Sequence, residues 1–162
     1  MNTRTSSHRD PRAVVIALMR AADVARREMT LVLEPHGITL QQANVLIILR
    51  LAGPQGLPTL GVAERLIEQA PAITQLMTAL VAKGYVRRKQ SRADRRQQLC
   101  FLTARGIRLI DEVLPGIRAS HARIVKRLPD DASGRLLELL TLIAGEYSLL
   151  PPTAGKGKRP TE

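Results

Sequence analysis

The chain has 162 residues, enough for one compact domain, and its apolar fraction of 44% is ordinary for a globular protein. Its formal net charge of +11 favours polyanionic partners, with nucleic acid ahead of an anionic membrane surface. Aromatic residues make up only 2%, which disfavours a stacking platform for single-stranded nucleic acid, and a single cysteine excludes an intrachain disulfide framework.

The first third of the chain predicts two helices. Residues 1–10 are polar and are expected to form a flexible arm. Asp10 followed by Pro11 is a typical helix start, and apolar residues at three- and four-residue spacing then predict a helix of about 23 residues that ends at "EPHGI", 34–38. Thr39 and Gln42 have the spacing of a capping box, which predicts a second helix that ends at "GPQGLP", 53–58.

The middle of the chain predicts a helix-turn-helix followed by a hairpin. Thr59 is expected to cap a short helix over 60–67, and the turn 68–70 leads to a second helix over 71–83, which Gly84 stops. The period then changes. Residues 85–90 and 97–103 read as two short strands, so the loop between them becomes the tip of a basic hairpin, or wing.

Helical spacing returns in the last third of the chain. It predicts a helix over 104–127, which Pro115 should kink, and a final helix over 131–149. The tail 151–162 has the composition of a disordered segment. No stretch of about 18 apolar residues and no signal peptide are visible, so we expect a cytoplasmic protein without a membrane partner.

The helix over 71–83 has one unusual face. Ile73, Leu76, Met77 and Leu80 should pack inward, while the opposite face is small, polar and uncharged. Such a face fits a major groove, where threonine methyls can contact thymine and Gln75 can bind adenine N6 and N7. The alternative is an exposed face whose charge is low by chance. The predicted recognition residues are Pro71, Ala72, Thr74, Gln75 and Thr78.

The hairpin carries a lone carboxylate among arginines. Arginines at a hairpin tip suit a narrow minor groove, and a carboxylate can hold one guanidinium by a bidentate pair and so aim the other. We assign Arg95 to the groove, Asp94 as the orienting carboxylate with Arg96 as its partner, and Arg92 to phosphate. The alternative is a solvated charge run. Further phosphate contacts are predicted for Lys83, Arg87, Arg88 and Lys89.

From about residue 35 to 106 the sequence resembles the MarR family of winged-helix transcriptional regulators. Four segments carry the resemblance, because the family pattern has a Leu-x-x-x-Gly-hydrophobic-Val-x-Arg run, then Asp-Arg-Arg and a Leu-Thr-x-x-Gly end. The segments are "GITLQQANVLIILRL" (37–51), "LGVAERL" (60–66), "AITQLMTALVAKGYVRR" (72–88) and "DRRQQLCFLTARG" (94–106). Gln69, Ala70 and Ala72 depart from the family pattern, which often has a Ser-like cap and a Thr there, so the recognition helix offers few hydrogen-bonding groups.

The resemblance implies a mainly α, α+β winged-helix fold of about six helices with a two- to three-stranded wing. It also implies an intertwined homodimer. Residues 11–35 and 103–150 would form the helical dimerisation region, and 36–102 the DNA-binding region. In many family members a small anionic or phenolic effector at the junction of the two regions releases DNA. His36 lies in that neighbourhood and is a candidate for the effector pocket.

The sequence gives little support for a redox, metal, catalytic or cofactor site. Cys100 alternates with apolar residues, and a buried cysteine is inert, so a redox role is disfavoured. His8, His36 and His121 lack metal-ligand spacing, and neither a catalytic constellation nor a cofactor motif is visible. We therefore predict a non-enzymatic, dimeric, sequence-specific regulator of double-stranded DNA, by resemblance a repressor, with a nonspecific or architectural DNA-binding protein as the alternative.

Overall fold

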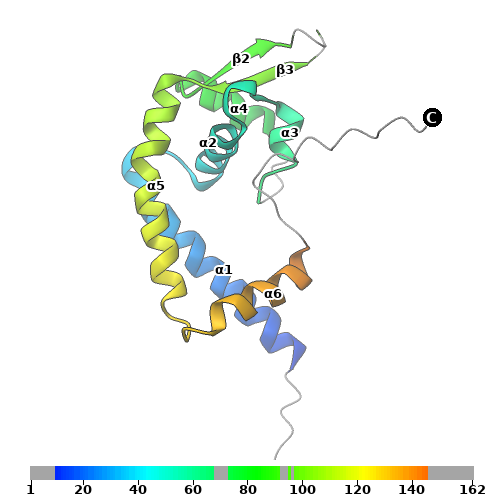
Figure 1. The fold of residues 1–162 in the computed structure, drawn as a ribbon, viewed down its shortest axis with the longest axis vertical. Helices are drawn as coiled ribbons and strands as arrows, with labels where there is room; N and C mark the ends of the chain where they lie inside the picture. The colour runs from blue at the N-terminus through cyan, green and yellow to red at the C-terminus, as the bar shows by residue number, and fades with distance from the viewer. Residues whose placement is uncertain (1–9, 68–72, 92–94, 96, 146–162) are drawn as a thin grey trace, which may run out of the picture.

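The computed structural model describes residues 10–67, 73–91, 95 and 97–145 (Figure 1). Within these residues it contains six α-helices, two short 3-10 helices and one three-stranded antiparallel sheet. The predicted mainly α winged-helix fold is therefore confirmed. None of the helices in this part of the chain has the length and apolar run that a membrane span requires.

The first two helices begin where their caps predict. In α1 (Pro11–Leu33), the backbone N–H of Arg12 donates to Asp10 Oδ1 at 3.0 Å. In α2 (Leu40–Ala52), the capping box is complete, since Gln42 N donates to Thr39 Oγ1 at 3.2 Å and Thr39 N donates to Gln42 Oε1 at 3.3 Å. The 3-10 helix η1 (Glu34–His36) joins them, and η2 (Gly53–Gln55) follows α2.

The helix-turn-helix consists of α3 (Thr59–Ala63) and α4 (Ile73–Ala82). The prediction that Thr59 caps α3 is wrong. Pro58 is the cap residue, Thr59 is already helical, and its hydroxyl lies 3.6 Å from Cys100 Sγ. The helix is also shorter than predicted because the chain tightens after Ala63. Arg65 N and Leu66 N donate to carbonyls three residues back, which turns Leu66 into the core.

The sheet has the order β1-β3-β2, with β1 (Leu57–Pro58), β2 (Val86–Gln90) and β3 (Gln98–Leu102). Val86 pairs with Leu102 and Gln90 with Gln98, so β2 and β3 form the predicted hairpin. The short strand β1 is added where Leu57 pairs with Cys100. The chain approaches β3 closely here, and only glycine fits at position 56, because a Cβ there would lie 2.6 Å from Phe101 Cε1.

Two further helices leave the sheet. Thr103 begins α5 (Ala104–Val125) by accepting a hydrogen bond from Gly106 N at 3.1 Å, and its hydroxyl donates to Gly84 O at 2.7 Å. Pro115 lies inside α5, which runs beside α1 down to α6 (Ala132–Ala144) (Figure 1). The final helix is shorter than the predicted 131–149, because Gly145 ends it with a positive φ of 77°.

The core lies in the winged-helix region, around α2. Val45, Leu46, Ile48 and Leu49 of α2 are at most 2% exposed, and the core cluster extends into α4 and α5. By contrast, α1 buries only Leu33, and α6 buries no residue. Within the described residues, much of the apolar surface of α1 and α6 thus stays exposed.

Candidate DNA-binding interface

The helix α4 has the predicted two faces. Met77 and Leu80 are fully buried, and Ile73 and Leu76 pack partly buried against the core. Thr74, Gln75 and Thr78 are exposed on the other side. The Thr78 hydroxyl donates to Thr74 O at 2.8 Å, which occupies its proton and leaves its methyl group and acceptor lone pairs for a partner. Pro71 and Ala72 lie outside the described residues.

Gln75 is the one long polar side chain on this exposed face of α4 as far as the structure describes it. Its amide has no hydrogen-bond partner among the described residues. A carboxamide offers two donors and an acceptor, which matches the N6 donor and N7 acceptor of adenine in the major groove. The surroundings therefore leave Gln75 available for a base contact.

The wing is tied together at the base of its tip. Gln90 Nε2 donates to the backbone oxygen of Arg95 at 2.6 Å, and Ser91 N donates to Gln97 O at 2.9 Å. These bonds fix the backbone on both sides of the loop, and they hold Arg95 in an exposed turn. Arg92, Asp94 and Arg96 lie outside the described residues, so the pairing of Asp94 with Arg96 stays a prediction.

The cations of β2 are all exposed but lie on both faces of the hairpin. Arg87 and Lys89 lie opposite Phe101 and Leu99, whereas Arg88 lies opposite the buried Cys100. The Arg87 guanidinium carbon is 4.6 Å from the centroid of the Phe101 ring, a cation–π arrangement that restricts this side chain. Because β2 is an edge strand, all three cations reach solvent, and their phosphate contacts stay predictions.

Lys83 differs from the other predicted phosphate contacts. Its ammonium donates to Gly37 O at 2.7 Å and to Gln42 Oε1 at 3.2 Å, so two of its three protons are engaged within the protein. Gly37 lies in the connection between α1 and α2, and Gln42 lies in the first turn of α2. The cation follows directly after α4 and bridges the recognition helix to the rest of the fold.

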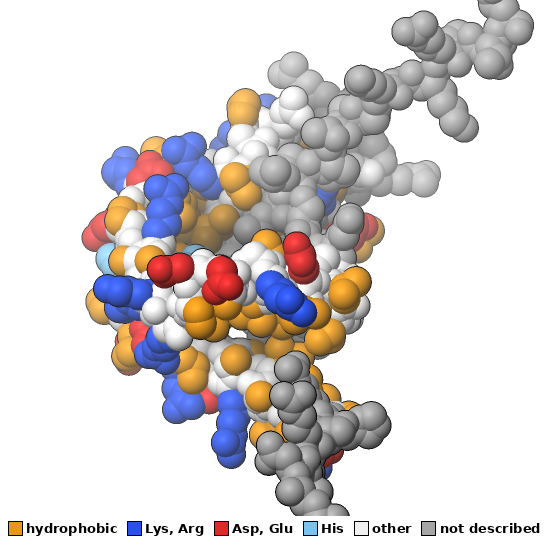
Figure 2. All heavy atoms as spheres, turned by 60° about the horizontal axis from the view of Figure 1, so that its bottom comes forward, with side chains coloured by type: hydrophobic (Ala, Val, Ile, Leu, Met, Phe, Trp, Pro, Cys, Tyr) orange, Lys and Arg blue, Asp and Glu red, His pale blue; other side chains and the backbone are white. Residues whose placement is uncertain are grey.

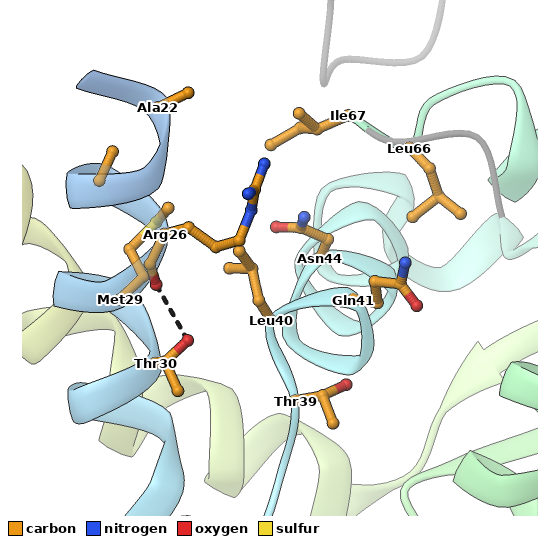
Figure 3. A pocket seen from close by; sticks show the side chains of 11 residues that line it. Ala22, Arg26, Met29, Thr30, Thr39, Leu40, Gln41, Asn44, Leu66 and Ile67 are labelled. Carbon is orange, nitrogen blue, oxygen red and sulfur yellow. Dashed lines mark hydrogen bonds between the residues drawn. The ribbon is translucent and has the colours of Figure 1, made fainter. Parts of the chain in front are cut away.

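A pocket of about 460 Å³ opens between α1, α2 and the segment after α3 (Figure 3). Apolar side chains dominate its wall, and the Arg26 side chain extends from α1 toward α2. The sequence analysis did not predict this pocket, although a cation beside Ala22, Ala25 and Met29 on one helix face could have indicated a binding site for an anion. The lining residues are Ala22, Ala25, Arg26, Met29, Thr30, Thr39, Leu40, Gln41, Asn44, Leu66 and Ile67.

His36 does not line that pocket. It lies on η1, and its Nδ1 is 3.6 Å from Glu112 Oε1 of α5, so the ring turns toward α5. Cys100 is fully buried, as expected for a structural cysteine. No group of three or more His, Cys, Asp and Glu side chains comes together in the described part of the chain.

Comparison with known proteins agrees with this geometry. The sequence pattern of the MarR family matches residues 38–97. An uncharacterised HTH-type transcriptional regulator of Bacillus subtilis (strain 168), YkoM, is 30% identical over 105 residues, which are 65% of this chain and 67% of that protein. The chain therefore belongs to the MarR family of transcriptional regulators.

Two solved structures illustrate the likeness. A mutant of MarR from E. coli, complexed with operator DNA, is 26% identical with a TM-score of 0.72, over 83% of this chain and 98% of that one. CouR from Rhodococcus jostii RHA1, bound to p-coumaroyl-CoA, is 25% identical with a TM-score of 0.72, over 83% of this chain and 94% of that one.

Proposed function

We propose that the protein is a homodimeric repressor that binds a pseudo-palindromic operator. In each half-site α4 enters the major groove, and the wing tip at Arg95 enters the adjacent minor groove. The observation that carries this proposal is the exposed, uncharged face of α4 beside a tethered basic hairpin. A small polar face can approach base edges closely, and arginines at a hairpin tip suit the negative potential of a narrow minor groove.

The dimer is supported by apolar surface that one chain leaves exposed. Leu142 is 82% exposed, and Leu137 of α6 and Met19 of α1 are each 67% exposed. Figure 2 brings forward the end of the molecule that carries α6, and it shows hydrophobic side chains gathered there. Large apolar side chains that are exposed together in this way are typical of a surface that binds a protein partner. A second copy is the simplest partner, because a two-fold axis pairs the same patch with itself.

Repression follows from the way the dimer would occupy DNA. Two winged helices that grip both grooves of adjacent half-sites cover a length of duplex, and where the operator overlaps a promoter, RNA polymerase needs that same length. A dimer bound across a promoter therefore excludes polymerase by simple competition. The related E. coli protein bound to operator DNA supports this arrangement by likeness of fold and sequence.

The test of this function is a gel shift with the DNA that lies upstream of the protein's own gene. Binding is measured against excess random DNA at about 150 mM salt, where nonspecific affinity is weak. We expect a discrete complex that survives the competitor. A complex that competitor abolishes on this and on flanking DNA would instead support the architectural alternative. Reduced transcription from the bound promoter in vitro then tests repression.

Gln75→Ala should change base preference at one position of each half-site. If Gln75 binds adenine through two hydrogen bonds, its loss costs roughly 1–3 kcal/mol at that base pair and little elsewhere. The measurement is the affinity for a set of operators in which each half-site position is changed in turn. An equal loss on every operator would move Gln75 to a phosphate contact.

We also propose that the pocket beside Arg26 binds a small aromatic anion that releases the DNA. The apolar wall fits a ring, and a guanidinium can pair with a carboxylate. Residues of both α1 and α2 line the pocket. A ligand there would therefore change how the dimerisation helix packs against the DNA-binding region. CouR bound to p-coumaroyl-CoA supports an aromatic acyl ligand as the first probe.

Arg26→Met should weaken the binding of p-coumarate by about tenfold, because it removes the cation while it keeps most of the side-chain volume. Calorimetric titration with p-coumarate and p-coumaroyl-CoA measures the affinity. Arg20→Met removes an exposed arginine of α1 that does not line the pocket and should leave the affinity unchanged. Equal losses in both variants would show a general charge effect, and no binding of either probe would exclude this ligand class.

A further inference from the structure

The side chain of Lys83 turns away from the proposed DNA-binding face. At 100° per residue it lies about 80° around the helix axis from Gln75, toward the side that carries the partly buried Leu76. Its ammonium reaches Gly37 O at 2.7 Å and Gln42 Oε1 at 3.2 Å. The cation at the end of the recognition helix is thus engaged inside the protein.

The two acceptors lie close to the start of α2, with Gly37 in the connection from α1 and Gln42 in the first turn of α2. Gly37 ends η1 in a left-handed conformation with φ 65°, which places its carbonyl beyond the end of that helix. Gln42 is buried at 8% exposure, and its Oε1 already accepts the hydrogen bond from Thr39 N that completes the capping box. One buried oxygen therefore receives a donor from the start of α2 and another from the end of α4.

This shared oxygen connects the recognition helix to the joint where α1 meets the DNA-binding region. Hydrogen bonds from a charged donor are shorter and stronger than neutral ones, and two of them from one ammonium connect α4 to two points near the start of α2. They restrict the tilt of α4 at its C-terminal end, and a change of tilt would displace Gln75 and Thr78 together. Positioning of this kind affects every base contact but leaves the attraction to phosphates unchanged.

We propose that Lys83 is a positioning residue for operator recognition and acts through Gly37 and Gln42, not through a phosphate. The proposal rests on the proposed function as an operator-binding regulator. It assigns to Lys83 a share of sequence specificity, although the residue touches no base. The proposal also makes the capping box of α2 part of the hydrogen-bond network that fixes the tilt of the recognition helix.

The salt dependence of binding separates the two roles. Lys83→Met keeps the aliphatic stem and removes the ammonium. We expect about tenfold weaker binding to the operator, unchanged binding to random DNA and an unchanged slope of log affinity against log salt. Lys89→Met, the matched control on the exposed edge of β2, should weaken both kinds of binding and lower the slope by about 0.9 for each phosphate that the variant no longer neutralises. A lower slope in Lys83→Met would overturn the proposal.

A double-mutant cycle tests the route through Gln42. Gln42→Met removes the shared oxygen from a buried position away from the DNA, and it should also reduce operator preference. Because both changes break the same link, the double variant should lose little more than Lys83→Met alone. Additive losses would overturn the proposal, as would full operator affinity in a folded Lys83→Met.

Lys83→Arg gives a variant that keeps a donor at this position. It should retain operator preference if the hydrogen bonds to Gly37 and Gln42 are what matters. Circular dichroism and thermal unfolding check that each variant is folded. Absence of operator preference in the wild-type protein would overturn the proposed function itself, and this inference with it. Operator preference in the wild type that Lys83→Met and Gln42→Met both leave unchanged would overturn this inference alone.

Discussion

Replacement of Leu137 and Leu142 by glutamate should convert the protein into a folded monomer that no longer holds its operator. Both leucines are exposed on α6, at 67% and 82%, and both lie outside the core of the single chain. Burial of one leucine contributes roughly 1.5–3 kcal/mol, and two-fold symmetry repeats each change in the partner. We expect the dimer to weaken by at least a thousandfold, or about 4 kcal/mol.

Loss of the dimer should carry over to DNA binding. Each monomer would bind one half-site without the high effective concentration that the second reading head supplies, which costs about 10²–10⁴ in operator affinity. Sedimentation and gel shift measure the two effects, and circular dichroism checks the fold. Leu60→Glu, at a 70% exposed leucine of α3, is the matched control for oligomeric state and should leave the dimer intact. A dimer that persists in the α6 variant would place the interface elsewhere.

The elements of the fold were predictable where the signal is local. The start of α1 follows from Asp10 and Pro11, and the start of α2 from the Thr39–Gln42 capping box, since each depends on residues within one turn. The resemblance allowed a third strand, but the position of β1 was not predicted from the residues, because its pairing of Leu57 with Cys100 joins segments far apart in the chain. The same long-range contact places Thr59 against Cys100 and moves the cap of α3 to Pro58.

In the candidate interface, the exposed face of α4 could be predicted from the sequence, whereas the contacts of Lys83 and the pocket beside Arg26 could not. The outer face of α4 follows from helical periodicity, so the exposure of Thr74, Gln75 and Thr78 was foreseen. Lys83 could not be separated from the exposed cations of β2, because its acceptors Gly37 and Gln42 lie more than 40 residues earlier. The pocket beside Arg26 was missed for the same reason, since three separate segments form it.

Arg95→Ala should weaken operator binding by about ten- to a hundredfold, because a guanidinium in the minor groove makes charge-assisted hydrogen bonds worth roughly 1.5–3 kcal/mol. The loss should be largest on operators with an A·T-rich stretch at the wing position, where the groove is narrow and its potential most negative. Arg95 is exposed, and among the described residues it is its backbone oxygen, not its side chain, that accepts the hydrogen bond from Gln90, so the dimer should remain folded. Titration of operators with A·T or G·C pairs at that position measures both effects.

Arg95→Lys separates charge from shape at the same site. Lysine keeps the attraction to the duplex but lacks the planar fork of arginine, so we expect a normal salt slope with a reduced preference for A·T pairs. Gln90→Ala removes the bond that holds the Arg95 backbone and should lower the same preference without any change of charge. Arg118→Ala, at an exposed arginine of α5, is the matched control for net charge and should affect neither quantity. If Arg118→Ala and Arg95→Ala weaken binding equally, the wing would act only as part of a diffuse positive field.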